Sequence, residues 1–186
     1  MLRMGILRIV AAAAIVGIVP AAEASMLRSM SLAELVSQAD DIVVAKVVSV
    51  SAAWDTAHRR ILSTVEVDVE EAWKGSSASQ HLTIVQPGGS VGDIEMTVHG
   101  MPTFSVAERA LLFLRRIAER EVVVGMSEGK RSLRWNPTSN QWFVDSPDSA
   151  CTVELSTEGK IRHAAAPPSV RLDAIRTEIR ALVSGE

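Results

Sequence analysis

Histidine is the side chain best suited to acid–base and metal chemistry near neutral pH. This chain has four of them, namely His58, His81, His99 and His163. None belongs to a His-x-His or His-x-x-x-His pair, so no two histidines have the spacing of two ligands to one metal ion. His99 has the most suggestive neighbours, because Asp93 and Glu95 precede it in a glycine-rich segment. A carboxylate–histidine pair still needs a nucleophile or a metal, and the sequence nominates neither.

The other polar motifs favour structural roles. Serines are frequent, and residues 88–92 (GGSVG) and 125–129 (GMSEG) have the Gly-x-Ser-x-Gly spacing of a hydrolase nucleophile, but spacing alone is a weak signal and we expect no nucleophile at either. Residues 87–92 (PGGSVG) have the glycines of a phosphate-binding loop but lack the following Lys-Ser/Thr. Glu66, Asp68 and Glu70 alternate with valines, and successive outward positions of a strand are about 7 Å apart, too far to share one calcium ion. We therefore expect no catalytic set, no metal site and no cofactor.

Tryptophan supplies the second group of candidate functional side chains, since the chain has 4 Trp and no Tyr. Trp135 and Trp142 flank an expected hairpin turn, where they either pair across the hairpin or form part of a binding surface. Trp54 lies in a polar turn and is the better candidate for an exposed contact, whereas Trp73 continues a strand pattern and is expected in the core. The candidate partner-binding residues come from these turns and from the glycine-rich loop: Trp54, Pro87, Gly88, Gly89, His99, Met101, Trp135 and Trp142.

Composition limits the classes of protein. The 186 residues are 47% hydrophobic and 22% charged, which suits one domain with a good core. The net charge of −3 argues against nucleic acid as a partner, because such binding needs an excess of basic residues. A single cysteine excludes an intrachain disulfide, a thiol-rich zinc site and an iron–sulfur cluster held by this chain alone.

The first 24 residues have the pattern of a secretory signal peptide. Arg3 and Arg8 precede the apolar run of residues 9–19, and an Ala-x-Ala exit follows, with cleavage expected after Ala24. A membrane anchor is the alternative, but a spanning helix needs about 20 apolar residues. We therefore predict an exported protein with no membrane span after cleavage. In an oxidising compartment Cys151 is either a buried small apolar residue or a reactive thiol.

Patterning predicts several strands between two helices. Ser31 and Glu34 form a capping box that begins a helix ending near residues 40–41. Apolar runs or period-two alternation predict strands at 42–50, 61–73, 81–86, 94–98, 109–115, 121–126, 132–135, 141–145, 152–155 and 160–162. The last four are expected to form two hairpins. After Pro167 and Pro168, a helix is expected with an apolar stripe of Leu172, Ile175, Ile179, Leu182 and Val183, ending at Gly185.

The order of these segments resembles known families. ADDIVVAKVVSV, a strand ending EEAWKG, LTIVQPGG and FSVAERALLFL together resemble the core of netrin-type modules and of the tissue inhibitors of metalloproteinases, which are OB-like barrels. The chain is also similar to uncharacterised secreted bacterial proteins. The recurring elements of that group are here Lys74-Gly75, Pro87-Gly88-Gly89, Gly100-Met101-Pro102-Thr103-Phe104 and Leu111 to Leu114. The likeness covers roughly residues 31–128.

Two departures limit what the resemblance implies. The animal inhibitors chelate the zinc of their target through an N-terminal cysteine, whereas this chain is expected to begin at Ser25 after cleavage. Their inhibitory mechanism is therefore not transferred. Ala107 also stands where a turn glycine would be expected before the Leu-Leu-Phe-Leu strand.

The predicted fold is mainly β: a small closed OB-like antiparallel β-barrel with a short N-terminal helix and a C-terminal amphipathic helix. The predicted divisions are a signal peptide at 1–24, the barrel with extra C-terminal hairpins at 25–166, and the C-terminal helix at 167–186. The predicted function is an exported, non-catalytic binding module that contacts an unknown protein or envelope ligand through the 87–104 loop and the Trp54 turn. The alternative is a small periplasmic enzyme using His99, Asp93 and Glu95.

Overall fold

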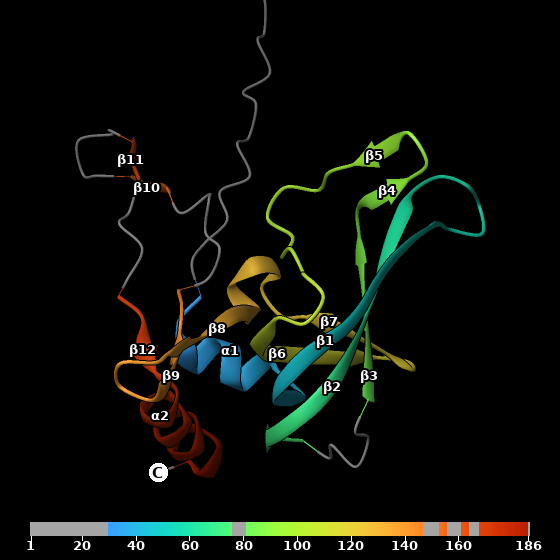
Figure 1. Ribbon diagram of the computed structural model, residues 1–186. Coiled ribbons are helices and arrows are strands. Elements are labelled where there is room, and N and C mark those ends of the chain that lie inside the picture. The colour runs from blue at the N-terminus through green and yellow to red at the C-terminus, as the bar shows by residue number, and fades with distance from the viewer. Residues whose placement is uncertain (1–29, 76–80, 147–152, 156–160, 164–167, 186) are drawn as a thin grey trace, which may run out of the picture.

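The computed structural model describes residues 30–75, 81–146, 153–155, 161–163 and 168–185. These residues form a mainly β fold with a short helix near one end of the chain and a longer helix near the other (Figure 1). The helices are α1 (Leu32–Gln38), the 3-10 helix η1 (Met126–Gly129) and α2 (Leu172–Ser184). The strands are β1 (Asp41–Trp54), β2 (Ile61–Lys74), β3 (His81–Pro87), β4 (Gly89–Val91), β5 (Ile94–Met96), β6 (Arg109–Ile117), β7 (Arg120–Val123), β8 (Lys130–Asn136), β9 (Gln141–Val144), β10 (Val153–Leu155), β11 (Ile161–His163) and β12 (Val170–Arg171).

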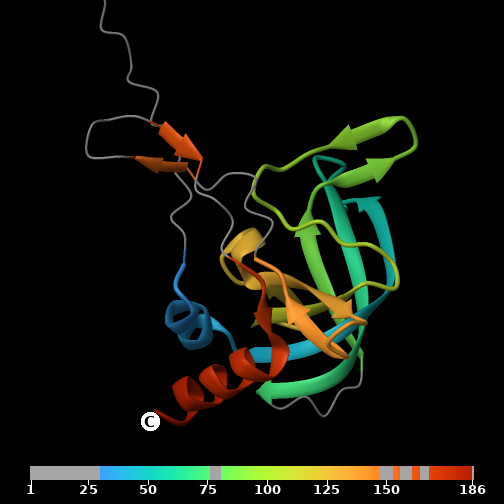
Figure 2. The same ribbon diagram turned by 60° about the vertical axis from the view of Figure 1, so that its left-hand side comes forward.

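Residues 41–45 of β1 and 110–114 of β6 are buried on both faces, as the near-continuous apolar sequence of the first strand predicts. On the inner face, β1, β2, β3 and β6 surround one apolar cluster made of Val43, Ala45, Val47, Val65, Val67, Ile84, Ala110, Leu112 and Leu114. On the outer face, α1 and α2 cover a second cluster that includes Leu35, Val36, Ile42, Val44, Trp73, Leu111, Phe113, Ile175 and Ile179. Both helices therefore lie on one side of the sheet (Figures 1 and 2).

Five of the strands form a partial ring. Antiparallel pairing joins β1 to β2, β2 to β3, β7 to β6 and β6 back to β1. Strand β3 meets β7 in parallel, at the residue pair Ile84 and Glu121. Strands β8, β9 and β12 then extend the sheet to eight strands. The predicted closed antiparallel barrel is therefore wrong in two respects, because the sheet is mixed and is ringed only in part.

The ring is partial because β6 divides one of its edges between two partners. Residues 114–117 of β6 pair with β7, and residues 110–112 pair with β8. Strand β7 has only four residues, so it covers a short part of that edge. Among the described strands, β3 and β8 do not pair with each other. Residues 97–108, which we call the strap, bridge the two sides: Gln86 of β3 donates to Pro102 O at 2.8 Å, and the Ser127 amide of η1 donates to Gly100 O at 2.8 Å.

Local sequence signals account for the ends of both helices. At α1 the predicted capping box is confirmed, because the Glu34 amide donates to Ser31 Oγ while the Glu34 carboxylate accepts from the Ser31 amide. At α2 the predicted stop is confirmed, since Gly185 adopts φ +74°. The predicted apolar stripe of α2 is buried only in its first three members. Leu182 and Val183, in the last turn of the helix, are exposed.

The predicted hairpins near the C-terminal end of the chain are confirmed where they are described. In the first of them, β8 pairs with β9, and Trp135 lies opposite Trp142 with ring centroids 5.3 Å apart. In the second, β10 pairs with β11. Cys151 and the predicted signal peptide at 1–24 lie outside the described residues.

Ala107 is the place where a glycine substitution should stabilise the protein. Its φ is +71°, and its amide donates to Val47 O at 2.9 Å, which fixes the strap against β1. A left-handed φ costs a residue with a Cβ about 1–2 kcal/mol, and glycine avoids this strain. The greater conformational freedom of glycine in the unfolded chain offsets part of the stability gained. We expect Ala107→Gly to raise the free energy of unfolding by roughly 0.5–1 kcal/mol, measured by urea denaturation.

A matched control is Ala181→Gly in α2, where the backbone is helical. That change should cost about 1 kcal/mol, because glycine is the poorer helix former. If both substitutions destabilised the protein equally, the strained conformation of Ala107 would be contradicted.

Candidate functional site

The β1–β2 turn holds Trp54 on a rigid support. The Asp55 amide donates to Arg60 O, and the Arg59 amide donates to Asp55 Oδ1 at 2.7 Å. That backbone hydrogen bond is the main reason why the pKa of Asp55 is lowered. His58 adopts φ +52° and stacks on Trp54 with ring centroids 6.1 Å apart. The turn therefore presents an aromatic pair in a fixed position.

The β4–β5 hairpin lies beside this turn because two glycines allow a close approach. Gly88 and Gly89 have φ of +109° and +124°, and Ser63 Oγ of β2 donates to Gly88 O at 2.7 Å. A Cβ at Gly89 would lie 2.6 Å from Ser63 Oγ and 2.9 Å from Ala52 Cβ, so a larger residue would push the hairpin away from β1 and β2. Gly88 is buried and Gly89 half-buried. Both glycines thus position the hairpin.

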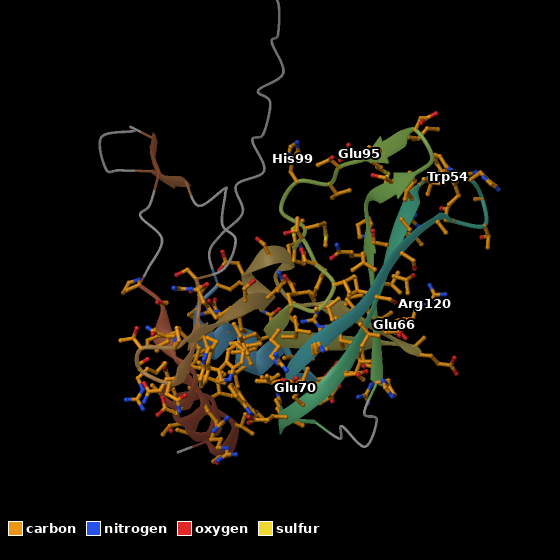
Figure 3. All side chains as sticks on the ribbon, in the orientation of Figure 1. Trp54, Glu66, Glu70, Glu95, His99 and Arg120 are labelled. Carbon is orange, nitrogen blue, oxygen red and sulfur yellow. The ribbon has the colours of Figure 1, made fainter. Side chains whose placement is uncertain are left out.

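The two hairpin ends form one tip at the end of the sheet away from the helices (Figures 1 and 2). We call this surface the tip; it consists of residues 54–60 and 91–95. Figure 3 shows Trp54 and Glu95 at this same end of the molecule. Ile94 on β5 is 54% exposed, and Trp54 is half-buried. The charged residues of the tip are of both signs: Asp55, Arg59, Arg60, Asp93 and Glu95.

The structure gives no direct support to a catalytic site at His99. The side chains of His99, Asp93 and Glu95 are all exposed. Within the part of the chain that the structure describes, no hydrogen bond or ion pair joins any two of them. That same part contains no group of three or more His, Cys, Asp or Glu residues placed to hold a metal ion. The enzyme alternative stays a prediction without a geometric argument.

The sequence-derived contact residues fall into separate places. Trp54, Pro87, Gly88 and Gly89 belong to the tip or its support. His99 and Met101 lie in the strap, and Trp135 and Trp142 lie on the β8–β9 hairpin next to the outer core. Trp142 packs there under the Arg109 guanidinium, 5.3 Å from its ring centroid. Sequence reasoning missed Ile94, for which the only signal was an apolar residue directly after the Gly92-Asp93 turn.

The strap is anchored by a buried ion pair. Lys130 Nζ lies 2.8 Å from Glu108 Oε1 and 5.1 Å from the ring centroid of Phe104. The Lys130 side chain is only 4% exposed, so these neighbours take the place of water around its ammonium group. Phe104 itself packs against the inner core. The Gly-x-Pro-x-Phe element of the strap therefore covers the open side of the partial ring.

The acidic row on β2 is a face with partners on neighbouring strands. Thr83 donates to Glu66, His81 lies 2.5 Å from Asp68, and Arg109 donates to both oxygens of Glu70. Each carboxylate thus pairs with a different residue of β3 or β6. The prediction that these positions form a polar strand face agrees with this arrangement.

Comparison with models of protein families, with curated proteins and with solved structures finds no match to this chain. Among the described helices, none is both long enough and apolar enough to cross a membrane.

Proposed function

We propose that this chain is an exported, non-catalytic binding module that contacts a protein partner through the tip. The observation that carries the proposal is that two hairpin ends, far apart in sequence, lie at the same end of the sheet and carry Trp54, the exposed Ile94 and charged residues of both signs. An apolar centre with a polar rim is the usual anatomy of a protein–protein interface. Tryptophan is also enriched among residues that dominate binding energy.

The strand order supports an OB-like relationship for the partial ring. Its pairing runs β1-β2-β3-β7-β6 and returns to β1. OB-folds are five-stranded, partly open barrels that bind ligands through their β2–β3 face and through loops that include the one between the first two strands. The tip contains that first loop. The acidic residues of the β2–β3 face disfavour nucleic acid there. The signal-peptide pattern at 1–24 supports export.

The test compares Ile94→Asp with Ile117→Asp in capture from the envelope fraction of the exporting cell. Both isoleucines are exposed to a similar degree, 54% and 56%, but Ile117 lies on the β6–β7 turn away from the tip. A buried charge at the centre of an interface costs several kcal/mol. We therefore expect Ile94→Asp to reduce the captured partner at least tenfold, and Ile117→Asp to leave it unchanged.

Equal loss in both variants, or loss in neither, would contradict the proposal. Circular dichroism and urea denaturation of each variant are the control for an intact fold. Trp54→Ala provides the second probe of the tip, and it should weaken capture in the same direction as Ile94→Asp.

A further inference from the structure

A cluster of charges occupies the end of the ring at which β1 begins. Asp41 and Glu121 are 1% and 5% exposed, and both accept from the Arg116 guanidinium, Asp41 at 2.5 Å and Glu121 at 3.1 Å. Asp40 accepts from the Arg116 amide at 2.9 Å. The nearby Lys74 directs its ammonium to the carbonyl oxygens of residues 36 and 39. Two carboxylates therefore share one guanidinium, and a third binds the backbone amide of the same arginine.

Glu121 is the least well compensated member of this cluster. Its Oε1 meets Arg116, but its Oε2 is buried and has no hydrogen-bond partner among the described residues. Burial raises the pKa of Glu121 above its usual value of 4.5, and the negative charges of Asp41 and Asp40 raise it further, although the hydrogen bond from Arg116 opposes them. The folded protein thus favours the neutral carboxyl more than an exposed glutamate would.

Glu121 also lies at the weakest point of the ring. Its pairing with Ile84 is the contact by which β7 meets β3. On its other side β7 pairs with β6 over residues 120–123. A seam with one backbone bridge and a strand of four residues on one side can open locally without unfolding the rest of the sheet. Opening there would let the Glu121 carboxylate reach water and would uncover the inner core near Ile84.

We propose that Glu121 is a pH-responsive latch on the β3–β7 seam, closed when its carboxyl is protonated and released more often when it is ionised. The charged groups that face it are Asp40 and Asp41 from β1 and Arg116 from β6, while β3 presents Ile84. Of these groups, Arg116 keeps its charge at all pH values of interest, because its pKa is raised. The latch goes beyond the proposed function, since it lies at a different end of the sheet from the tip.

The direction of the pH effect follows from linkage. Below 4.5 both the closed and the open state hold the Glu121 proton, so the seam has its full stability. Between 4.5 and the raised pKa of the closed state, only the closed state holds the proton, and the opening constant rises up to tenfold per pH unit. Above that pKa the opening constant stays at its higher value.

The test is amide hydrogen exchange in β7 as a function of pH, corrected for the intrinsic exchange rate. We expect protection of the β7 amides to fall several-fold as the pH rises from 4.5 to 7.5 in the wild-type protein and to stay constant in Glu121→Gln. Glu119→Gln, on the exposed β6–β7 turn, is the matched control and should behave as the wild type. The same pH dependence in Glu121→Gln and the wild type would overturn the proposal, as would protection that rises with pH.

A second measurement keeps the proposal testable if Glu121→Gln does not fold. The side-chain carboxyl of Glu121 can be titrated by NMR in the wild-type protein. Its midpoint is expected above 4.5, and Asp41→Asn should lower it by removing a neighbouring negative charge. A wild-type midpoint at or below 4.5 would overturn the latch. Neither measurement involves the tip, so failure of the latch is distinguishable from failure of the proposed function.

Discussion

Glu108→Gln is expected to lower the free energy of unfolding by about 3 kcal/mol, because it removes the carboxylate that pairs with the buried, charged Lys130. The Lys130 side chain is 4% exposed, and the Glu108 carboxylate lies 2.8 Å from its ammonium. Ser132 Oγ at 3.4 Å and the face of Phe104 at 5.1 Å remain, but neither carries a charge. Urea denaturation monitored by tryptophan fluorescence measures the loss.

The matched control is Glu70→Gln, which breaks a pair of similar geometry on the surface. Glu70 and Arg109 are 35% and 37% exposed, so water compensates for the missing charge, and the cost should stay below about 1 kcal/mol. Combining Glu108→Gln with Lys130→Met removes both charges and should recover most of the stability. Equal losses from Glu108→Gln and Glu70→Gln would show that the Lys130 charge is not buried in solution.

This ion pair illustrates what local sequence patterns cannot reveal. Lys130 directly follows Gly129 and stands before a strand, where a lysine ordinarily faces water. It is buried because the strap, which is more than twenty residues away in sequence, lies over it with Glu108 and Phe104. No pattern within β8 encodes that contact. Only the pairing of distant segments does.

Elements with strong periodicity were predicted well. The alternation of valine with acidic residues at 65–70 identified β2, and the capping box at Ser31 identified the start of α1. The facing tryptophans of the β8–β9 hairpin followed from an Asn-Pro turn between two apolar runs. Each of these signals is local, because the interactions that determine it join residues within about ten positions of one another in the sequence.

Ring closure was predicted incorrectly because it depends on strand length and edge sharing. The prediction gave 121–126 as one strand, whereas β7 ends at Val123 and the chain then turns through Gly125 and Met126 at φ of +64° and +59°. That turn leads into η1 and sends β8 to the same edge of β6 that β7 uses. The valine-rich sequence at 122–124 does not show where pairing stops.

The candidate site was predicted only in part, because tertiary contacts bring its segments together. Trp54 and the Gly88-Gly89 turn were identified from residue type and turn chemistry. Their neighbour Ile94 was missed, because nothing in the sequence shows that the β4–β5 hairpin returns to the β1–β2 turn. The close approach at Gly89, where a Cβ would lie 2.9 Å from Ala52 Cβ, is a tertiary contact.

Gly129→Ala is expected to destabilise the protein by about 3 kcal/mol or more, at the upper end of the range for overpacking. A Cβ at this position would lie 2.1 Å from Val124 O, 2.9 Å from Val123 Cγ1 and 3.1 Å from the Val124 carbonyl carbon. Two of these atoms belong to the backbone, so a change of side-chain rotamer cannot relieve the clash. Gly129 is also buried, so a small backbone shift cannot move the added methyl group into solvent. Thermal and urea denaturation measure the effect.

Gly92→Ala is the control, because Gly92 also belongs to a turn but a Cβ there meets nothing within 4 Å. Its φ of +59° limits the cost to about 1–2 kcal/mol. The location of the damage distinguishes a clash at η1 from general unfolding. Since Gly129 sets the turn that brings β8 to β6, amide protection in β8 and β9 should fall before protection in β1 and β2. Uniform loss of protection across the sheet, or a cost no greater than that of Gly92→Ala, would mean that η1 does not direct the division of the β6 edge.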